Sequence, residues 1–458
     1  MVNNFIFYDT ETSDRDPFFG QIFQFAAIHT DKNLATIDEF DIRSKRLPHI
    51  LPSPGALLVN GLDPHQLDQA PFTNYEFAGQ VRKRLLDWSP AIVTGYNIFS
   101  FDEKYLRSLF YQNLYPPYLS QTNGNARIDI LPLVQAAEHL YPDALIYPLN
   151  EKGRTSKKLE DIAPANGFQN HKAHDALGDV EATIFVAELI KSKAPILWEA
   201  ALDAKNRHEA RMRANRTPVF FIHDRNYGHP ITFPAVIIGS IHNGRDLLVA
   251  DLRFDLPTQS EISIDKLFNG PTRLCRTIKL AEAPLLFSSE EFYSMPHTYT
   301  WEEASINEKI ELWSSLKEKM DITELYSEQL IPFEKAEYPE AALYEDFDAF
   351  DRDAQTMRSF HEANPTKKLE LVNCFSDVRF RTFARRIIYD NYYGILSADE
   401  RTKFSNAILD RLKREDEVPW VTVSRALREA DELLEQHSDF TQNILNIREF
   451  LISNKKFC

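Results

Sequence analysis

The first forty residues contain three consecutive strand-like segments, and this feature limits the possible folds more than any other. The segments are short, rich in aromatic and β-branched side chains, and separated by polar turns: residues 4–11 (NFIFYDTE), 21–30 (QIFQFAAIHT) and 35–43 (ATIDEFDIR). Helix-like stretches and one buried strand follow, at residues 77–88, 91–96, 102–113 and 128–140. Strands followed by interleaved helices predict a mixed α/β domain.

Residues 175–191 give the clearest helix pattern in the chain. Apolar side chains recur there at spacings of three and four residues, at Ala176, Val180, Ile184, Ala187 and Ile190. Asp175 precedes them in an N-cap position. The first domain is therefore expected to end near residue 193.

The pattern changes after Pro195, and a chain of 458 residues is long enough for two to four domains. A helix-like segment at 196–214 precedes strand-like segments with intervening turn signals, at 217–224, 231–242 and 245–254. Helical additions are expected over 302–330, and the chain is mostly helical from about residue 345. The sequence predicts an α+β multidomain protein with domains at 1–193, 194–343 and 344–458.

Composition indicates a soluble globular protein, with 43% hydrophobic and 26% charged residues. No apolar run approaches the roughly 18–20 residues that span a bilayer, and the N-terminus lacks the pattern of a secretion signal. The three cysteines are far apart and have no metal-binding spacing, which fits a reducing cytoplasm: Cys275, Cys374 and Cys458. The net charge of −16 argues mildly against nucleic acid as a partner. A metal-dependent nuclease nevertheless needs acidic residues, and a local basic groove can coexist with an acidic exterior.

Asp9 and Glu11 lie at the end of the first predicted strand. Because strand side chains alternate between faces, residues i and i+2 point the same way, so these two carboxylates share one face. Neighbouring carboxylates repel each other unless a cation lies between them, and a divalent metal with oxygen ligands fits that position. The D-x-E pattern is common by chance, and a solvated strand end is the alternative interpretation.

Two further segments place acidic side chains where helices begin. Residues 95–102 (GYNIFSFD) form an apolar strand that turns into Asp102, for which a helix N-cap is the alternative role. Residues 174–179 (HDALGD) place His174 in a loop and Asp179 in the first turns of the following helix. Histidine titrates near neutral pH and can take a proton from water. A plain loop or capping role is the alternative for this histidine.

The three segments together are more specific than any one of them. Four carboxylates and one histidine occur in the order Asp-x-Glu, Asp, His-x4-Asp, each at a strand end or a helix start. Two-metal phosphodiester hydrolysis needs such a set, because one cation orients and deprotonates a water while the other stabilises the leaving 3′-oxygen. The sequence contains no Ser/His/Asp set, glycine-rich phosphate loop or Cys/His cluster as a competing site.

These residues resemble the DEDD superfamily of 3′→5′ exonucleases, in its histidine-containing branch. The resemblance is carried by YDTET, GYNIFSFD, LEDIAPANG and HDALGDVEAT. A closer similarity, to the bacterial exodeoxyribonuclease I family, extends through FQFAAIHTD, PSPGALLVNGLDP, FYQNLYPPY, LYEDFDAFDRDAQ and RFRTFARRIIYDNYYG. It implies an RNase H-like exonuclease domain, an SH3-like β domain and a C-terminal helical domain that together enclose a single DNA strand.

The resemblance also implies roles for individual residues. Two Mg²⁺ ions, for which Mn²⁺ can substitute, would be held by Asp9, Glu11, Asp102 and Asp179, and His174 would be the general base. DNA contacts would come from Glu11, Arg107, Tyr118, Lys158 and Arg207. Lys158 departs from the family's arginine and loses its bidentate geometry. Thr122 stands near the place where the family has a second aromatic residue. The departures at Lys158 and Thr122 both weaken the expected binding of the DNA strand.

Three runs rich in basic residues are further candidates for DNA contact. They are Lys152, Arg154, Lys157 and Lys158; Arg207, Arg211, Arg213 and Arg216; and a run that mixes cations with aromatic rings, Arg379, Phe380, Arg381, Phe383, Arg385 and Arg386. Cations interleaved with aromatic side chains are typical of surfaces that bind single strands. A solvated helix face with its apolar side turned inward is the alternative for each run.

The sequence thus predicts a processive 3′→5′ exodeoxyribonuclease that releases 5′-mononucleotides from single-stranded DNA and acts in DNA repair and recombination. By resemblance, the C-terminal tail of single-strand-binding protein is an expected partner. A cytoplasmic monomer without a membrane segment is expected. A ribonuclease or proofreading exonuclease on the same fold stays open, because discrimination depends on how a pocket treats the 2′-hydroxyl. A catalytically silent nucleic-acid scaffold is the alternative from a different class.

Overall fold

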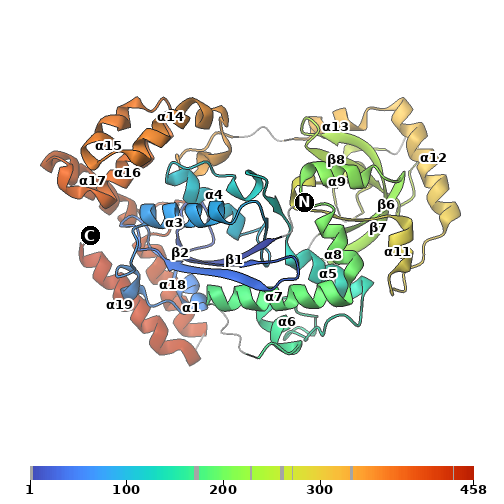
Figure 1. Ribbon diagram of the computed structural model, residues 1–458, viewed down its shortest axis with the longest axis horizontal. Coiled ribbons are helices and arrows are strands. Elements are labelled where there is room, and N and C mark those ends of the chain that lie inside the picture. The colour runs from blue at the N-terminus through green and yellow to red at the C-terminus, as the bar shows by residue number, and fades with distance from the viewer. Residues whose placement is uncertain are drawn as a thin grey trace.

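The N-terminal part of the chain is built around a five-stranded mixed sheet (Figure 1). The computed structural model describes residues 4–169, 175–226, 229–257, 262–270, 272–330, 334–436 and 438–457. The strands of this sheet are β1 (Phe5–Thr12), β2 (Ile22–Thr30), β3 (Thr36–Arg43), β4 (Ile92–Thr94) and β5 (Ala126–Arg127). Their order is β3-β2-β1-β4-β5, with β1–β2 and β2–β3 antiparallel and β1–β4 and β4–β5 parallel. The three predicted N-terminal strands and the mixed α/β architecture are confirmed.

Helices cover both faces of β1, because its alternate side chains are buried on opposite sides. Phe5 and Phe7 belong to a hydrophobic cluster with residues of α5 (Ile130–Leu140) and α7 (Ala176–Lys193). Ile6 and Tyr8 belong to another cluster with residues of α3 (Asn74–Asp87) and α4 (Asp102–Gln112). The end of β1 therefore lies between α7 on one face and α4 on the other.

One helix start excludes an alternative interpretation of the sequence, and another differs from the sequence prediction. Asp102 is the first residue of α4, and Phe101 occupies the N-cap position, so Asp102 is not the helix cap. The segment predicted as one helix over 196–214 forms α8 (Pro195–Leu202) and α9 (Arg207–Ala214). The interruption has a local cause, since the side chain of Asn206 accepts a 3.0 Å hydrogen bond from the backbone of Glu209 and starts a new helix.

The middle part contains a second, antiparallel five-stranded sheet, seen at the right of Figure 1. Its strands are β6 (Val219–Asn226), β7 (His229–Ile241), β8 (Asp246–Asp251), β9 (Cys275–Ile278) and β10 (Leu285–Phe287), in the order β10-β6-β7-β8-β9. Its associated helices are α10 (Ile264–Phe268), α11 (Ser289–Ser294), α12 (Glu303–Lys319) and α13 (Ile322–Glu328). The β-rich second part and its helical additions agree with the sequence prediction.

The C-terminal part is helical and lies against the first sheet's domain on the side away from the middle sheet (Figure 1). Its helices are α14 (Asp348–Glu362), α15 (Pro365–Leu371), α16 (Val378–Asn391), α17 (Ala398–Lys413), α18 (Val423–Gln436) and α19 (Thr441–Phe457). Two hydrophobic clusters join it to the N-terminal part: one includes Tyr111 and Phe383, and the other includes Leu57 of α1 (Pro54–Asn60) and Ala426. Among the described helices, none is long and apolar enough to cross a membrane.

Candidate active site

Asp9, Glu11 and Asp179 form a cluster of carboxylates at the end of β1. Asp9 and Glu11 project from the face of β1 that α7 covers, and Asp179 comes from the first turn of α7. One carboxylate oxygen of each residue lies within 4.8 Å of the others, a spacing that suits a shared metal ion. Glu11 is buried, while Asp9 and Asp179 are partly exposed. The structure thus brings three of the predicted metal ligands together.

Asp102 reaches the same site from the other face of β1. Its Oδ1 accepts hydrogen bonds from the backbone nitrogen of Thr10 (3.1 Å) and from the Thr10 hydroxyl (2.6 Å). Thr10 lies between Asp9 and Glu11 but points toward α4, because strand side chains alternate. Asp102 lines the same cavity as the three clustered carboxylates but lies outside their close group. No sequence pattern indicated that Thr10 holds Asp102 in this way.

The four carboxylates share a cavity with a volume of about 590 Å³. Its wall continues through Tyr96 and Asn97 after β4, through Leu131 and Gln135 of α5, and through the start of α6 (Leu159–Ala165). The side-chain oxygen Oε1 of Gln135 is buried without a hydrogen-bond partner among the described residues. Tyr96 donates a 2.5 Å hydrogen bond to the carbonyl oxygen of Lys157, which ties the two walls together. Sequence reasoning missed Tyr96 and Gln135 as site residues, although Tyr96 stands inside the GYNIFSFD motif.

The electrostatics of the cluster favour a bound cation. Burial raises the pKa of Asp9 well above its usual value, and the charges of Asp102, Glu11 and Asp179 raise it further. The pKa of Glu11 is raised by burial and by Asp179, and burial also raises the pKa of Asp102. Like charges crowded in a buried site disfavour ionisation, and a divalent cation with oxygen ligands reverses that effect. The donor set therefore fits a hard divalent metal.

The predicted general base, His174, lies outside the described residues, so its role stays a prediction. The next residue, Asp175, occupies the N-cap position of α7 as expected, but its side chain makes no capping hydrogen bond. Its Oδ1 instead accepts from Gln24 Nε2 (3.1 Å) and pairs with Arg43 (3.5 Å). Strands β2 and β3 therefore fix the beginning of the helix that carries Asp179.

Of the predicted DNA contacts, Glu11 and Lys158 line the carboxylate cavity. The Lys158 side chain is largely exposed and forms a 2.7 Å ion pair with Glu160. Arg107 is mostly buried and pairs with Glu103, and its guanidinium lies 5.2 Å from the centre of the Tyr118 ring. Arg207 is exposed at the beginning of α9 and does not line this cavity.

The prediction that residues 379–386 form a strand-binding surface is wrong for most of that run. Phe380 and Phe383 are buried in the core of the helical part and cannot stack on a base. Arg379 binds Asp377 and the carbonyl oxygens of residues 342 and 345, and Arg386 pairs with Glu340. In the second basic run, Arg213 is likewise buried, between Asp203 and Glu291. These cations hold the fold together rather than facing a strand.

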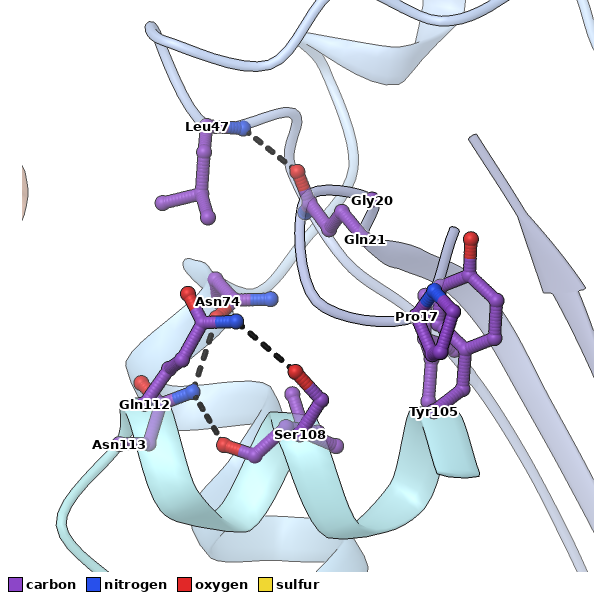
Figure 2. A pocket seen from close by; sticks show the side chains of 11 residues that line it. Pro17, Gly20, Gln21, Leu47, Asn74, Tyr105, Ser108, Gln112 and Asn113 are labelled. Atoms are coloured by element: carbon purple, nitrogen blue, oxygen red, sulfur yellow. Dashed lines mark hydrogen bonds between the residues drawn. The ribbon is translucent and has the colours of Figure 1, made fainter. Parts of the chain in front are cut away.

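Figure 2 shows a second, much smaller pocket between the Pro17–Gln21 loop and α4. Its volume is about 20 Å³, and its lining contains no carboxylate, histidine, lysine or arginine. Asn113 donates to Asn74 (2.9 Å), and Gln112 donates to Ser108 (2.8 Å). These bonds satisfy the polar groups of a packed junction, and the pocket offers no chemistry that competes with the carboxylate cavity.

A mixed sheet with acidic residues at the end of its central strand and in the first turns of two flanking helices is typical of metal-dependent nucleases of the exonuclease class. Residues 6–187 match the family model described as Exonuclease, and residues 337–451 match the Exonuclease I C-terminal domain. The chain therefore resembles the exonuclease I family in both of these regions.

Curated relatives are exodeoxyribonucleases I. That of Escherichia coli K12 is 34% identical over 209 residues, which cover 45% of this chain and 44% of the relative. That of Buchnera aphidicola from Schizaphis graminum is 28% identical over 438 residues, which cover 89% and 87%. The matched region of the chain thus spans about half the length of the E. coli relative.

Solved structures of relatives have the same fold over the whole chain. E. coli exonuclease I in complex with a dA16 oligonucleotide superposes with a TM-score of 0.86 and 22% identity, covering 100% of both chains. The exonuclease I of Methylocaldum szegediense gives a TM-score of 0.80 and 24% identity, covering 98% of this chain and 99% of that chain. The expected α+β fold is therefore confirmed.

Proposed function

We propose that this protein is a processive 3′→5′ exodeoxyribonuclease that releases 5′-mononucleotides from single-stranded DNA. The carboxylate cluster of Asp9, Glu11 and Asp179, with Asp102 on the same cavity wall, carries the proposal. The substrate is supported by relatives, since E. coli exonuclease I has been solved in complex with dA16 and dT13 oligonucleotides. The curated relatives are named exodeoxyribonuclease I.

The four carboxylates would hold two Mg²⁺ ions, with Mn²⁺ as a possible substitute. Such ions lower the pKa of a bound water and stabilise charge on the phosphate and the leaving oxygen. Thr10 keeps Asp102 oriented through two hydrogen bonds, and the first turn of α7 presents Asp179. His174 remains the proposed general base on sequence grounds alone.

The proposed strand contacts divide into two groups. Lys158 lies on the cavity wall with an exposed ammonium group, so it can approach a phosphate close to the scissile bond. Arg107, Tyr118 and Arg207 are proposed to contact the strand farther from the carboxylates. A lysine at 158 supplies charge without the fork geometry of arginine, so we expect a weaker and less oriented phosphate contact there.

We also propose that the functional domains span 1–193, 194–343 and 344–458, and that the protein acts as a cytoplasmic monomer in DNA repair and recombination. The match to the Exonuclease model ends at residue 187, which supports the first boundary. The match to the Exonuclease I C-terminal domain begins at residue 337, which supports the second boundary. Single-strand-binding protein is the proposed protein partner, supported by a solved structure described as SSB/Exonuclease I in complex with an inhibitor.

Asp9→Ala tests the active-site assignment. The variant loses one ligand of the cluster, so we expect Mg²⁺-dependent degradation of a 5′-labelled single strand to fall by about 100-fold or more. Circular dichroism and the urea midpoint should show an intact fold, because removing one of several repelling carboxylates costs little stability. Wild-type rates in the variant would show that the site has been placed wrongly.

Substrate choice separates the proposal from its rivals. Single-stranded DNA, duplex DNA and RNA, each labelled at the 5′ end, are compared at equal Mg²⁺, and rapid loss of the single-stranded DNA alone is expected. Equal loss of RNA would favour a ribonuclease. Binding of all substrates without cleavage would favour a silent scaffold.

A further inference from the structure

Glu103 follows Asp102 in α4 and is one of the most completely buried acidic residues of the described chain, with 1% of its surface exposed. Its Oε1 accepts hydrogen bonds from Arg107 Nε (3.0 Å) and Nη2 (2.9 Å), from Arg127 Nη1 (2.9 Å) and from Ser120 Oγ (2.6 Å). Its Oε2 accepts from the hydroxyl of Tyr8 (3.2 Å). No motif in the sequence analysis includes this residue.

Two arginines compensate the charge of the buried Glu103 carboxylate. Three N–H groups of Arg107 and Arg127 donate to its Oε1, and both guanidinium groups lie beside it. A buried carboxylate between two arginines is expensive to disrupt, because removing one partner leaves an uncompensated charge in the interior. Glu103 is therefore the hub of a buried hydrogen-bond network that joins both arginines, Ser120 and Tyr8.

The hub fixes α4 against β1 on both sides of Asp9. Tyr8 precedes Asp9 and donates to Glu103, while Thr10 follows Asp9 and donates to Asp102. Asp102 and Glu103 are thus hydrogen-bonded to Thr10 and Tyr8. Thr10 and Tyr8 are the two sequence neighbours of the predicted metal ligand Asp9. The N-cap residue of α4, Phe101, makes no side-chain capping hydrogen bond. Glu103 and Asp102 therefore set the position of the helix start.

The same hub reaches the groups proposed to grip the strand. Arg107 lies over the Tyr118 ring at 5.2 Å, and Tyr118 in turn lies 6.1 Å from the ring of Phe347, which precedes α14. Arg127 donates to Gln121 (3.0 Å) and to the carbonyl oxygen of Ala281 (2.9 Å), which belongs to the middle part of the chain. One carboxylate connects the first turn of α4 with the other two parts of the molecule.

We propose that Glu103 is a positioning residue that sets the geometry of Asp102 for metal binding and couples it to Arg107 and Tyr118. This inference rests on the proposed function. It adds a physical connection between the residues proposed to contact the DNA strand and the metal ligand Asp102. Residues that hydrogen-bond a metal ligand commonly change metal affinity by about 10–100-fold when they are altered. Glu103 acts on Asp102 through the position of the helix start, so we expect an effect near the lower end of that range.

Glu103→Gln is the test, and Glu340→Gln is its matched control. Glu340 is equally buried and also pairs with two arginines, Arg386 (2.9 Å) and Arg411 (3.1 Å), but it lies in the segment before the helical part and lines no part of the carboxylate cavity. The two substitutions remove the same charge from similar surroundings. Both variants are expected to lose stability in urea denaturation.

The readout is Mn²⁺ binding to the full-length protein by isothermal titration calorimetry, which does not depend on catalysis. We expect Glu103→Gln to weaken Mn²⁺ binding by about 10-fold or more, and Glu340→Gln to leave it within about 2-fold of wild type. If Glu103→Gln does not fold, Tyr8→Phe replaces it, with an expected weakening of roughly 3-fold. Wild-type affinity in the folded Glu103 or Tyr8 variant, or an equal loss in the Glu340 variant, would overturn the inference.

DNA cleavage is measured in parallel, so that the two proposals fail separately. Wild-type protein that binds Mn²⁺ but leaves single-stranded DNA intact would refute the proposed function, and the calorimetric comparison would still decide the role of Glu103. Wild-type protein that binds no Mn²⁺ would refute the inference itself.

Discussion

Thr10 illustrates how much of the site depends on single residues that carry no charge. It separates Asp9 from Glu11 and faces α4, where its hydroxyl and backbone nitrogen hold one oxygen of Asp102. The other oxygen of Asp102 is thereby left in a defined orientation next to the cavity. The D-x-E pattern predicted the two acidic residues, whereas the middle residue acts through a contact with a residue ninety-two positions away.

Thr10→Val tests this arrangement at nearly constant side-chain volume. A hydrogen bond to a charged group contributes about 1.5–3 kcal/mol, so we expect kcat on 5′-labelled single-stranded DNA to fall by about 10-fold or more. Thr10→Ser keeps the hydroxyl and should retain most of the wild-type rate. A Val variant as fast as the Ser variant would mean that Asp102 does not need this hydroxyl.

At the scale of elements, the sequence predicted those whose patterns are local. The three N-terminal strands were found from their aromatic and β-branched residues and polar turns, and α7 was found from its helical periodicity. Asp9, Glu11, Asp102 and Asp179 were found because each lies at an element's end. Gly95, inside the GYNIFSFD motif, meets a local need as well, since a Cβ there would lie 2.5 Å from the carbonyl oxygen of Tyr8. Local order could therefore predict which side chains gather at the end of β1.

The function of a charged side chain was predicted less well, because it depends on distant partners. Arg379 and Arg386 resembled strand contacts but bind groups from the segment before α14. A signal was available for the aromatic residues of that run: Phe380, Phe383 and Ile387 recur at helical spacing and form a buried face. Glu103 had a local signal only for Arg107, four residues along the same helix, whereas Arg127 and Tyr8 reach it through tertiary packing.

The start of α3 gives a prediction at this scale. Thr73 caps the helix by accepting from the backbone nitrogen of Glu76, and the Glu76 side chain accepts from the backbone nitrogen of Thr73. Thr73→Ala removes half of this capping box, so we expect a loss of about 1 kcal/mol in the free energy of unfolding. Thr402→Ala, on the exposed face of α17, is the matched control and should change stability by less than about 0.5 kcal/mol in the same urea titration. Equal effects of the two substitutions would contradict the capping role.

On the scale of the whole molecule, the helical part is docked on the N-terminal part through a histidine. His361 of α14 stacks on Tyr115, with ring centres 3.9 Å apart, and its ring centre lies 5.7 Å from that of Tyr75 of α3. Its Nε2 lies 3.0 Å from the carbonyl oxygen of Leu114, and its Nδ1 lies 2.8 Å from the hydroxyl of Tyr75. A carbonyl only accepts, so Nε2 donates and Nδ1 accepts from the tyrosine. This arrangement suits the neutral imidazole, whereas a protonated ring would have to donate from Nδ1 to the Tyr75 hydroxyl instead.

The preference of the buried ring for the neutral form makes the docking dependent on pH, with a sign that follows from linkage. Burial lowers the pKa of His361 to about 4, and the charges of Lys368 and Arg82 lower it, although the hydrogen bond to Leu114 acts in the opposite direction. The unfolded chain takes up this proton near the usual pKa of about 6.5, whereas the folded protein resists it. Stability should therefore be fully present above pH 6.5 and decrease as the pH falls toward 4, by no more than about 3 kcal/mol from this residue.

His361→Gln removes the titrating group and is the test. Urea denaturation at pH 7 and pH 5 should show that the wild-type protein loses more stability on acidification than the variant does. A second buried histidine, His49, has its pKa lowered by burial and by Arg386 and Arg411, so a residual loss is expected in the variant. His65→Gln serves as the control, since it removes a histidine outside this stack and should leave the pH dependence at the wild-type slope. If His361→Gln and wild type lose equal stability between pH 7 and pH 5, the neutral histidine is not what couples the docking of the helical part to pH.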